Sequence, residues 1–211
     1  MAQTHYIIED GGQLQKLAAE EGKKSVLLLG DSIRLGYCET VKAILAGAAN
    51  VFYPEENCRS TQYTIMSLLT WSSLCDREAV DLVHFNCGHW DVAHWNGEPV
   101  SLTPAEVYAE NVRRIVWQLR KLFPNARIVF ATTTPMNPNG KVGINPRFTA
   151  EIRTYNEAAL EALRGLDVEV DDLFAAAEGW DETWYADYCH PTEAGFAELG
   201  KTVAAFLRER L

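Results

Sequence analysis

The stretch SVLLLGDSI, residues 25–33, decides the fold of this chain. A short apolar run leads without interruption into Gly30-Asp31-Ser32. Such continuous runs are typical of strands that are buried on both faces of a parallel sheet. We therefore expect a first strand over Ser25–Leu29, with Ser32 just beyond its carboxyl end, where a helix begins.

Four further short runs along the chain have the composition of strands. They cover Asn50–Tyr53, Asp81–Asn86, Arg127–Thr132 and Val168–Val170. Longer amphipathic segments lie between them, and strands that alternate with helices pair in parallel. The sequence predicts an α/β fold, a three-layer α/β/α sandwich around a five-stranded parallel sheet. Since no repeat or Pro/Gly-rich linker interrupts the chain, we expect a single domain over residues 1–211.

Two helix starts can be read from local signals. In the first, Thr103 is expected as the N-cap, with Pro104 in the first turn and Glu106 three residues after the cap. Apolar residues then recur at intervals of three and four until Pro124 ends the helix. A similar apolar face predicts that the last helix begins near Thr192.

Composition excludes several classes of partner. The formal net charge of −10 disfavours nucleic acids and anionic membrane surfaces, and no apolar run is long enough for membrane insertion. Residues 1–12 have no basic region followed by an apolar run, so no secretory signal is expected. The five cysteines are odd in number and lack CxxC spacing, which indicates reduced thiols in a cytoplasmic protein. The oligomeric state is left open.

Chemistry-bearing residues lie near both ends of the chain. Free backbone N–H groups at a helix start suit a developing oxyanion beside Ser32, although Ser32 could also be a simple N-cap. Asp187 precedes His190 by three residues, so its carboxylate can orient the imidazole within one turn. Taken alone, this pair could equally be a surface histidine beside a helix cap.

Together, Gly-Asp-Ser at 30–32 and Asp-x-x-His-Pro at 187–191 resemble the blocks of the SGNH (GDSL-type) hydrolase family. The resemblance implies a flavodoxin-like SGNH fold. It also implies a catalytic triad in which Ser32 is the nucleophile, His190 the general base and then acid, and Asp187 the orienting carboxylate.

The resemblance also implies an oxyanion hole, to which Ser32 contributes its N–H. The second block of the family corresponds to residues 57–60, with Cys58 at the position of the usual glycine donor. The third block reads Gly88-His89-Trp90-Asp91, so Trp90 replaces the usual asparagine.

A substitute donor is therefore needed. Asn86 is similar to the asparagine of a sub-branch with Asn-x-Gly-x-x-Asp in its third block, and we expect it to complete the hole. Asn57 is the alternative, and Asn86 could also serve only to tie down the loop.

Residues near these blocks are expected to contact substrate. They are Asp31, Arg34, Arg59, Gly88, His89, Trp90 and Trp184. Arg34 and Arg59 could bind an acidic group or pair with carboxylates of the chain. Trp184, like Trp90, Trp95 and Trp180, should approach the carboxyl end of the sheet, where an aromatic face can stack on a sugar or cover an acyl chain. The long segment 133–148 is expected to form a flexible wall or lid.

No cofactor and no metal are expected. Residues 84, 89 and 94 are histidines, but their spacing fits no common zinc pattern, and His84 is expected in the core.

The sequence thus predicts a serine esterase that hydrolyses a short acyl ester, with an O-acetylated carbohydrate as one candidate, through an acyl-enzyme on Ser32. The alternatives are a thioesterase or lysophospholipase for longer acyl chains, and a carbohydrate-binding protein that has lost efficient catalysis.

Overall fold

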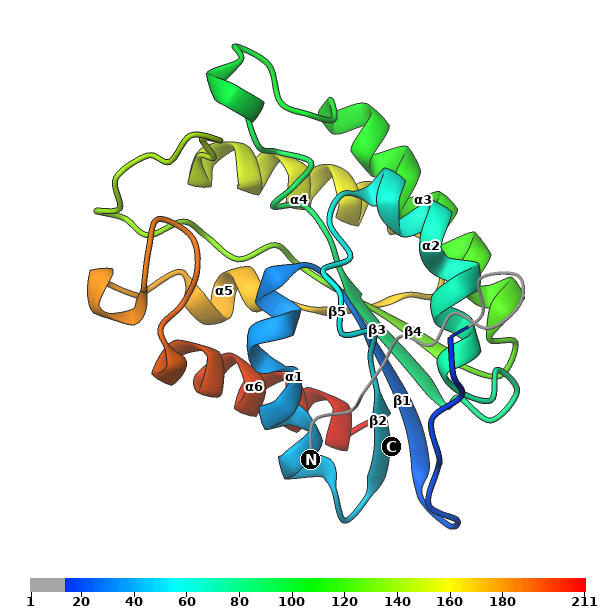
Figure 1. Cartoon of the computed structure of the whole chain (residues 1–211). Coiled ribbons are helices and arrows are strands. Elements are labelled where there is room, and N and C mark those ends of the chain that lie inside the picture. Colours follow the sequence, from blue (N-terminus) through cyan, green and yellow to red (C-terminus); the bar gives the residue numbers. More distant parts are fainter. Residues whose placement is uncertain (1–13) are drawn as a thin grey trace.

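Five parallel strands form the centre of the protein, which is described by a computed structural model over residues 14–211. The strand order is β2-β1-β3-β4-β5 (Figure 1). The strands are β1 (Lys24–Leu29), β2 (Ala49–Phe52), β3 (Leu82–Asn86), β4 (Arg127–Ala131) and β5 (Glu169–Asp171). Each bound lies within one residue of its expected position, so the predicted α/β fold is confirmed. Residues 1–12, where no secretory signal was expected, lie outside the described residues.

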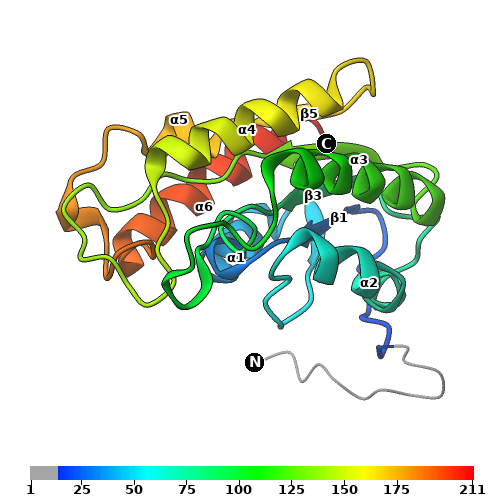
Figure 2. The same cartoon turned by 90° about the horizontal axis from the view of Figure 1, so that it is seen from above.

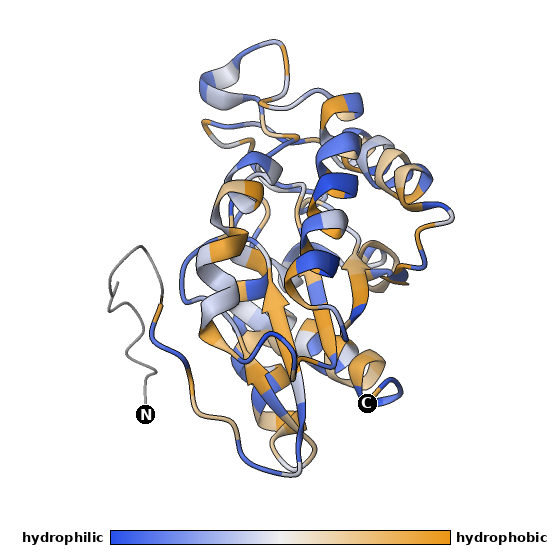
Figure 3. Cartoon of the chain, turned by 90° about the vertical axis from the view of Figure 1, so that its right-hand side faces the viewer, coloured by the Kyte–Doolittle hydropathy of each residue, from blue (hydrophilic) through white to orange (hydrophobic). Residues whose placement is uncertain are grey.

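Helices cover both faces of this sheet (Figures 1 and 2). They are α1 (Ser32–Leu45), α2 (Thr61–Trp71), α3 (Ala105–Leu122), α4 (Thr149–Leu163), α5 (Leu173–Ala177) and α6 (Glu193–Arg208). Helices α1 and α6 lie on one face, and α2, α3 and α4 lie on the other. Side chains of β1 alternate between two cores: Val26 and Leu28 pack with α1 and α6, whereas Leu27 and Leu29 pack on the opposite side. Figure 3 shows the apolar colour along the strands.

The two predicted helix starts have different outcomes. Thr192 is the N-cap of α6, and its hydroxyl accepts the Gly195 N–H at 3.3 Å, as expected. The Thr103 prediction is wrong, because α3 begins at Ala105 with Pro104 as its cap and without a side-chain hydrogen bond. The buried Thr103 hydroxyl instead bonds to the Gln62 amide on α2, a tertiary contact that replaces the local one.

Helices α1 and α6 pack closely through two glycines. A Cβ at Gly36 would lie 2.1 Å from the Phe196 ring, and one at Gly200 would lie 2.6 Å from Cβ of Thr40. Only a residue without a side chain permits this approach. The two helices therefore hold a fixed position relative to each other, and the chain enters both from the same edge of the sheet.

The sheet has a topological switch point at β1, which lies between β2 and β3. In open parallel sheets, ligands bind beyond the carboxyl ends of strands at such a point. Among residues 14–211, no helix is both long and apolar enough to cross a membrane.

Candidate active site

Ser32 is the first residue of α1, immediately beyond the β1 strand. The N-cap of this helix is Asp31, whose carboxylate accepts the Ile33 N–H at 3.0 Å. Because Asp31 caps the helix, the Ser32 hydroxyl is not the cap and is available to other partners. Its own N–H lies in the first turn, where helical geometry provides no acceptor.

The Ser32 hydroxyl meets a histidine from the far end of the chain. Ser32 Oγ lies 2.8 Å from Nε2 of His190, and Nδ1 of His190 lies 2.7 Å from Oδ2 of Asp187. The second carboxylate oxygen of Asp187 accepts the backbone N–H groups of Cys189 at 2.8 Å and His190 at 2.7 Å. Asp187 thus fixes both the imidazole and the turn that carries it, an arrangement that suits nucleophile activation by a general base.

The charge on Asp187 is stabilised by these contacts. Burial by itself would raise the pKa of Asp187, but the N–H groups of His190 and Cys189 and the His190 side chain outweigh it. The pKa of Asp187 is held below its usual value, so the carboxylate is ionised at neutral pH. An ionised Asp187 favours the imidazolium that forms when His190 takes a proton.

Of the expected oxyanion donors, the backbone N–H of Cys58 is already bound in the structure. The Cys58 N–H donates to the Gly30 carbonyl at 3.0 Å, because residue 58 lies directly against the nucleophile loop. The Asn86 amide donates one N–H to Asp31 Oδ1 at 3.1 Å, which supports the helix cap and leaves its second N–H for another acceptor. Asn57, the alternative, uses its side-chain oxygen to accept the Arg59 N–H at 2.8 Å.

Two residues that were expected to contact substrate are buried and structural. Asp31 is fully buried beneath Ser32, and burial raises its pKa. Arg34 is also fully buried, and its guanidinium donates to the carbonyls of Pro54 at 2.8 Å and Glu56 at 2.7 Å. Arg34 therefore fastens the segment before Cys58 to the nucleophile helix, where no substrate can reach it.

The third block forms a tight turn after β3. Gly88 adopts a φ of +146°, and a Cβ there would lie 2.0 Å from the Thr133 hydroxyl. His89 is buried, and its Nε2 lies 3.0 Å from Oγ1 of Thr134. Trp90 is half-buried and faces Trp95, with 5.2 Å between ring centroids. Of these three block residues, Trp90 has the accessible surface that a substrate contact requires.

His84 is a core residue, as expected. It is fully buried on β3, and its Nε2 lies 2.9 Å from Oδ2 of Asp171 on β5. Within residues 14–211, one group of side chains is close enough to share a metal ion, namely Asp187, Cys189 and His190. These residues lie close together because Asp187 hydrogen-bonds to His190 and to the Cys189 N–H.

The long segment 133–148 is a wall that braces the Asp187–His190 turn, a role that the sequence did not reveal. The Asn137 amide donates to the Asp187 carbonyl at 3.0 Å. Arg147 donates to the His89 carbonyl and, at 3.0 Å, to the Tyr188 hydroxyl. The length of the segment hinted at a function, but neither Arg147 nor Asn137 belongs to a recognisable motif.

A second tryptophan pair lies beside His190. Trp180 and Trp184 stack with centroids 4.8 Å apart, and the Trp184 carbonyl accepts the Thr192 N–H at 2.8 Å. The pair thus lies at the start of α6, whose N-cap Thr192 follows His190 by two residues. Both tryptophan pairs therefore lie near the carboxyl end of the sheet.

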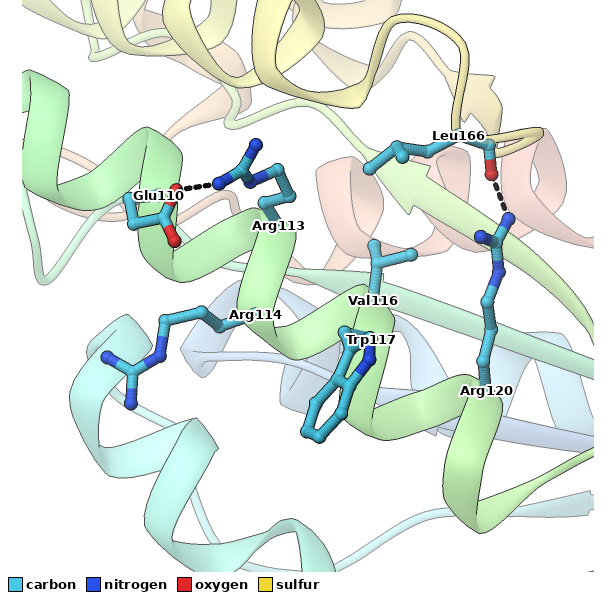
Figure 4. A pocket seen from close by; sticks show the side chains of 7 residues that line it. All are labelled: Glu110, Arg113, Arg114, Val116, Trp117, Arg120 and Leu166. Carbon is cyan, nitrogen blue, oxygen red and sulfur yellow. Dashed lines mark hydrogen bonds and ion pairs between the residues drawn. The ribbon is translucent and has the colours of Figure 1, made fainter.

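A groove of about 330 Å³ lies elsewhere, between α3 and the segment before β5 (Figure 4). Trp117, Arg120 and Leu166 are among its lining residues, and Arg120 donates to the Leu166 carbonyl. Because Leu166 precedes β5, this groove opens near the amino ends of the strands, away from Ser32.

Comparisons with known proteins agree with this geometry. The model of the GDSL-like Lipase/Acylhydrolase family matches residues 28–197. GDSL esterase/lipase WDL1 of Oryza sativa subsp. japonica is 25% identical over 138 residues, which are 61% of this chain and 53% of that protein. The chain spans about half the length of the curated relatives it matches.

Solved structures with the same fold include a lipase/acylhydrolase from Enterococcus faecalis, with a TM-score of 0.69 and 18% sequence identity. The match covers 89% of this chain and 97% of that one. Est24, a carbohydrate acetylesterase from Sinorhizobium meliloti, has a TM-score of 0.68, 17% identity and coverage of 90% and 100%, respectively. At these identities the similarity establishes the fold.

Proposed function

Since the chain belongs to the GDSL-like lipase/acylhydrolase family, a family of carboxylic ester hydrolases, we propose that it hydrolyses short acyl esters through an acyl-enzyme on Ser32. The observation that carries the proposal is the continuous contact from Ser32 Oγ through His190 to Asp187, at 2.8 Å and 2.7 Å.

Each step of the mechanism uses one of these contacts. Ser32 Oγ attacks the ester carbonyl while Nε2 of His190 takes its proton, and His190 then gives that proton to the departing alcohol. Water attacks the acyl group on Ser32, again with His190 as the base, and the acid is released. Asp187 holds the productive tautomer of His190 throughout.

The oxyanion would be bound first by the Ser32 N–H at the start of α1. The second donor we assign is the Arg59 N–H, because its acceptor is the side-chain oxygen of Asn57, which can rotate away, whereas the Cys58 N–H is bound to a backbone carbonyl. This assignment takes Arg59 in place of Cys58.

As substrate we propose an O-acetylated carbohydrate. The two tryptophan pairs support this choice, since aromatic rings stack on the apolar faces of sugars. Est24 shows that the same fold can be used by a carbohydrate acetylesterase. Five unpaired, buried thiols agree with a cytoplasmic location, which stays a prediction.

The test is hydrolysis of p-nitrophenyl acetate by the wild type, Ser32→Ala and His190→Ala. We expect turnover to fall by about 10⁴-fold or more in both variants, and Ser67→Ala on α2 serves as the control. Undiminished turnover in either triad variant would overturn the mechanism. A panel of acetylated sugars and acyl esters of increasing length then identifies the substrate, and activity that rises with chain length would favour a thioesterase or lysophospholipase instead.

A further inference from the structure

Arg59 is held in an unusual backbone conformation beside the nucleophile loop. Its φ of +54° is in the left-handed region, which residues other than glycine rarely adopt. The preceding residue, Cys58, is bonded to the Gly30 carbonyl, two positions before Ser32. This hydrogen bond places Arg59 one residue from the contact with the loop that carries Ser32. Strain of this kind is often found at functional sites.

The Arg59 guanidinium lies between two aromatic rings. Its Cζ is 4.6 Å from the centroid of Tyr63 and 5.8 Å from that of Trp90. Tyr63 is in turn held by a 2.7 Å hydrogen bond from its hydroxyl to Glu56. The rings hold the planar cation in place without using its N–H donors.

No side chain or carbonyl within residues 14–211 accepts a hydrogen bond from the Arg59 guanidinium. Other exposed arginines of this acidic chain do find carboxylates, as Arg127 does with Glu169 and Arg153 with Glu178. The nearby Glu56 carboxylate already accepts from Tyr63 and, at 2.6 Å, from Trp71. Among residues 14–211, Arg59 therefore offers a guanidinium held by two rings and without an acceptor for its N–H donors.

Trp90 makes this side of the site suitable for a sugar. It occupies the third-block position where the family resemblance leads us to expect asparagine, and it is half-buried next to Trp95. A pyranose can place its apolar face on such a ring while its substituents reach Arg59. A guanidinium binds a carboxylate through two parallel hydrogen bonds.

We propose that Arg59, stacked on Tyr63 and Trp90, binds the carboxylate of an acidic sugar whose acetyl ester is presented to Ser32. The proposal rests on the esterase activity proposed above and assigns its substrate class as acetylated uronic acids. The net charge of −10 does not oppose this binding at close range, because charges beyond about 8 Å are screened at physiological salt.

The experiment compares acetylated galacturonic acid with its methyl ester, which has the same acetyl group but no charge. We expect the wild type to hydrolyse the acid with a kcat/KM about tenfold to a hundredfold higher. Arg59→Gly, which relieves the backbone strain and removes the guanidinium, should abolish this ratio, and Arg59→Lys should retain part of it. Arg113→Gln on the distant face of α3 should leave the ratio at its wild-type value.

Each outcome has one meaning. Hydrolysis of both esters with a ratio near one in the wild type, or a ratio unchanged in Arg59→Gly, overturns the subsite and leaves the esterase proposal standing. A phosphorylated sugar acetate that is preferred to the uronate overturns the carboxylate assignment. If neither ester is hydrolysed although p-nitrophenyl acetate is, the uronate assignment is overturned. If p-nitrophenyl acetate is not hydrolysed either, the esterase proposal fails, and calorimetry with galacturonate then decides the subsite: binding lost in Arg59→Gly supports it, and no binding to the wild type overturns it.

Discussion

The Asn86 amide donates a 3.1 Å hydrogen bond to Asp31, and Asp31 in turn caps the helix that begins at Ser32. Asn86 is therefore connected to the nucleophile through the carboxylate beneath it. Because both side chains are buried, the bond has no water to replace it.

Asn86→Ala should consequently lower stability more clearly than catalysis. The loss of the amide leaves a buried carboxylate with one partner fewer, which typically costs about 1–3 kcal/mol. We expect the free energy of unfolding in urea to fall by that amount and kcat for p-nitrophenyl acetate to fall less than about tenfold. A drop of about a hundredfold or more in kcat would instead identify Asn86 as an oxyanion donor.

Gly88→Ala should destabilise the third block. Its φ of +146° disfavours any side chain, and the new Cβ would overlap the buried Thr133 hydroxyl. We expect a loss of at least about 2 kcal/mol in the free energy of unfolding. Gly179→Ala is the matched control, because a Cβ there meets nothing within 4 Å. Equal stability of the two variants would contradict the strain argument.

Removal of the Asn137 side chain should loosen the turn that carries the triad. Asn137→Ala deletes the bond to the Asp187 carbonyl, so we expect kcat to fall by about tenfold with KM nearly unchanged. Asn139→Ala is the control, since Asn139 lies in the same loop as Asn137 but its amide bonds to Glu182 and not to the Asp187–His190 turn. If both variants lose activity equally, the loop as a whole is responsible and the bond from Asn137 is not.

His89 should make stability depend on pH in the acid range. Burial lowers the pKa of His89 to about 3, and repulsion from Arg147 and His190 adds to this effect. The unfolded chain, with a histidine pKa near 6.5, therefore binds more protons than the folded protein between about pH 3 and 6.5. The free energy of unfolding must rise with pH across this window and level off above it.

The matching measurement is urea unfolding at pH 4.5 and 7.5 for the wild type and His89→Gln. The wild type should lose about 2.7 kcal/mol more than the variant on acidification, because pH 4.5 lies two units below the unfolded pKa and one proton contributes about 1.4 kcal/mol per unit. Parallel losses in the two proteins would show that His89 is not the group responsible.

The sequence revealed most of the fold because buried parallel strands are continuous apolar runs, as at Ser25–Leu29. It also indicated that Ser32, Asp187 and His190 come together, as their contacts in the structure show, since each lies in a short local pattern at a strand end or a helix start. The burial of Arg34 could not be predicted, because it depends on carbonyls that converge only after folding.

Backbone hydrogen bonds between distant segments could not be predicted for the same reason. The Cys58 N–H reaches the Gly30 carbonyl only because the ends of two strands approach each other in the fold. At Thr103 a strong local capping signal was overridden by a contact with Gln62, so local preference alone gave the wrong helix start.

The close packing of α1 on α6 has a consequence for how activity first arises. Ser32 and His190 are 158 residues apart, and each stands at the entrance to one of these two helices. A chain emerging from the ribosome can pair β1 with β2 early, but the proposed nucleophile Ser32 has no His190 beside it until α6 docks through Gly36 and Gly200. In refolding experiments, esterase activity should therefore appear after most of the circular-dichroism signal has returned, and turnover would report on the last stage of assembly.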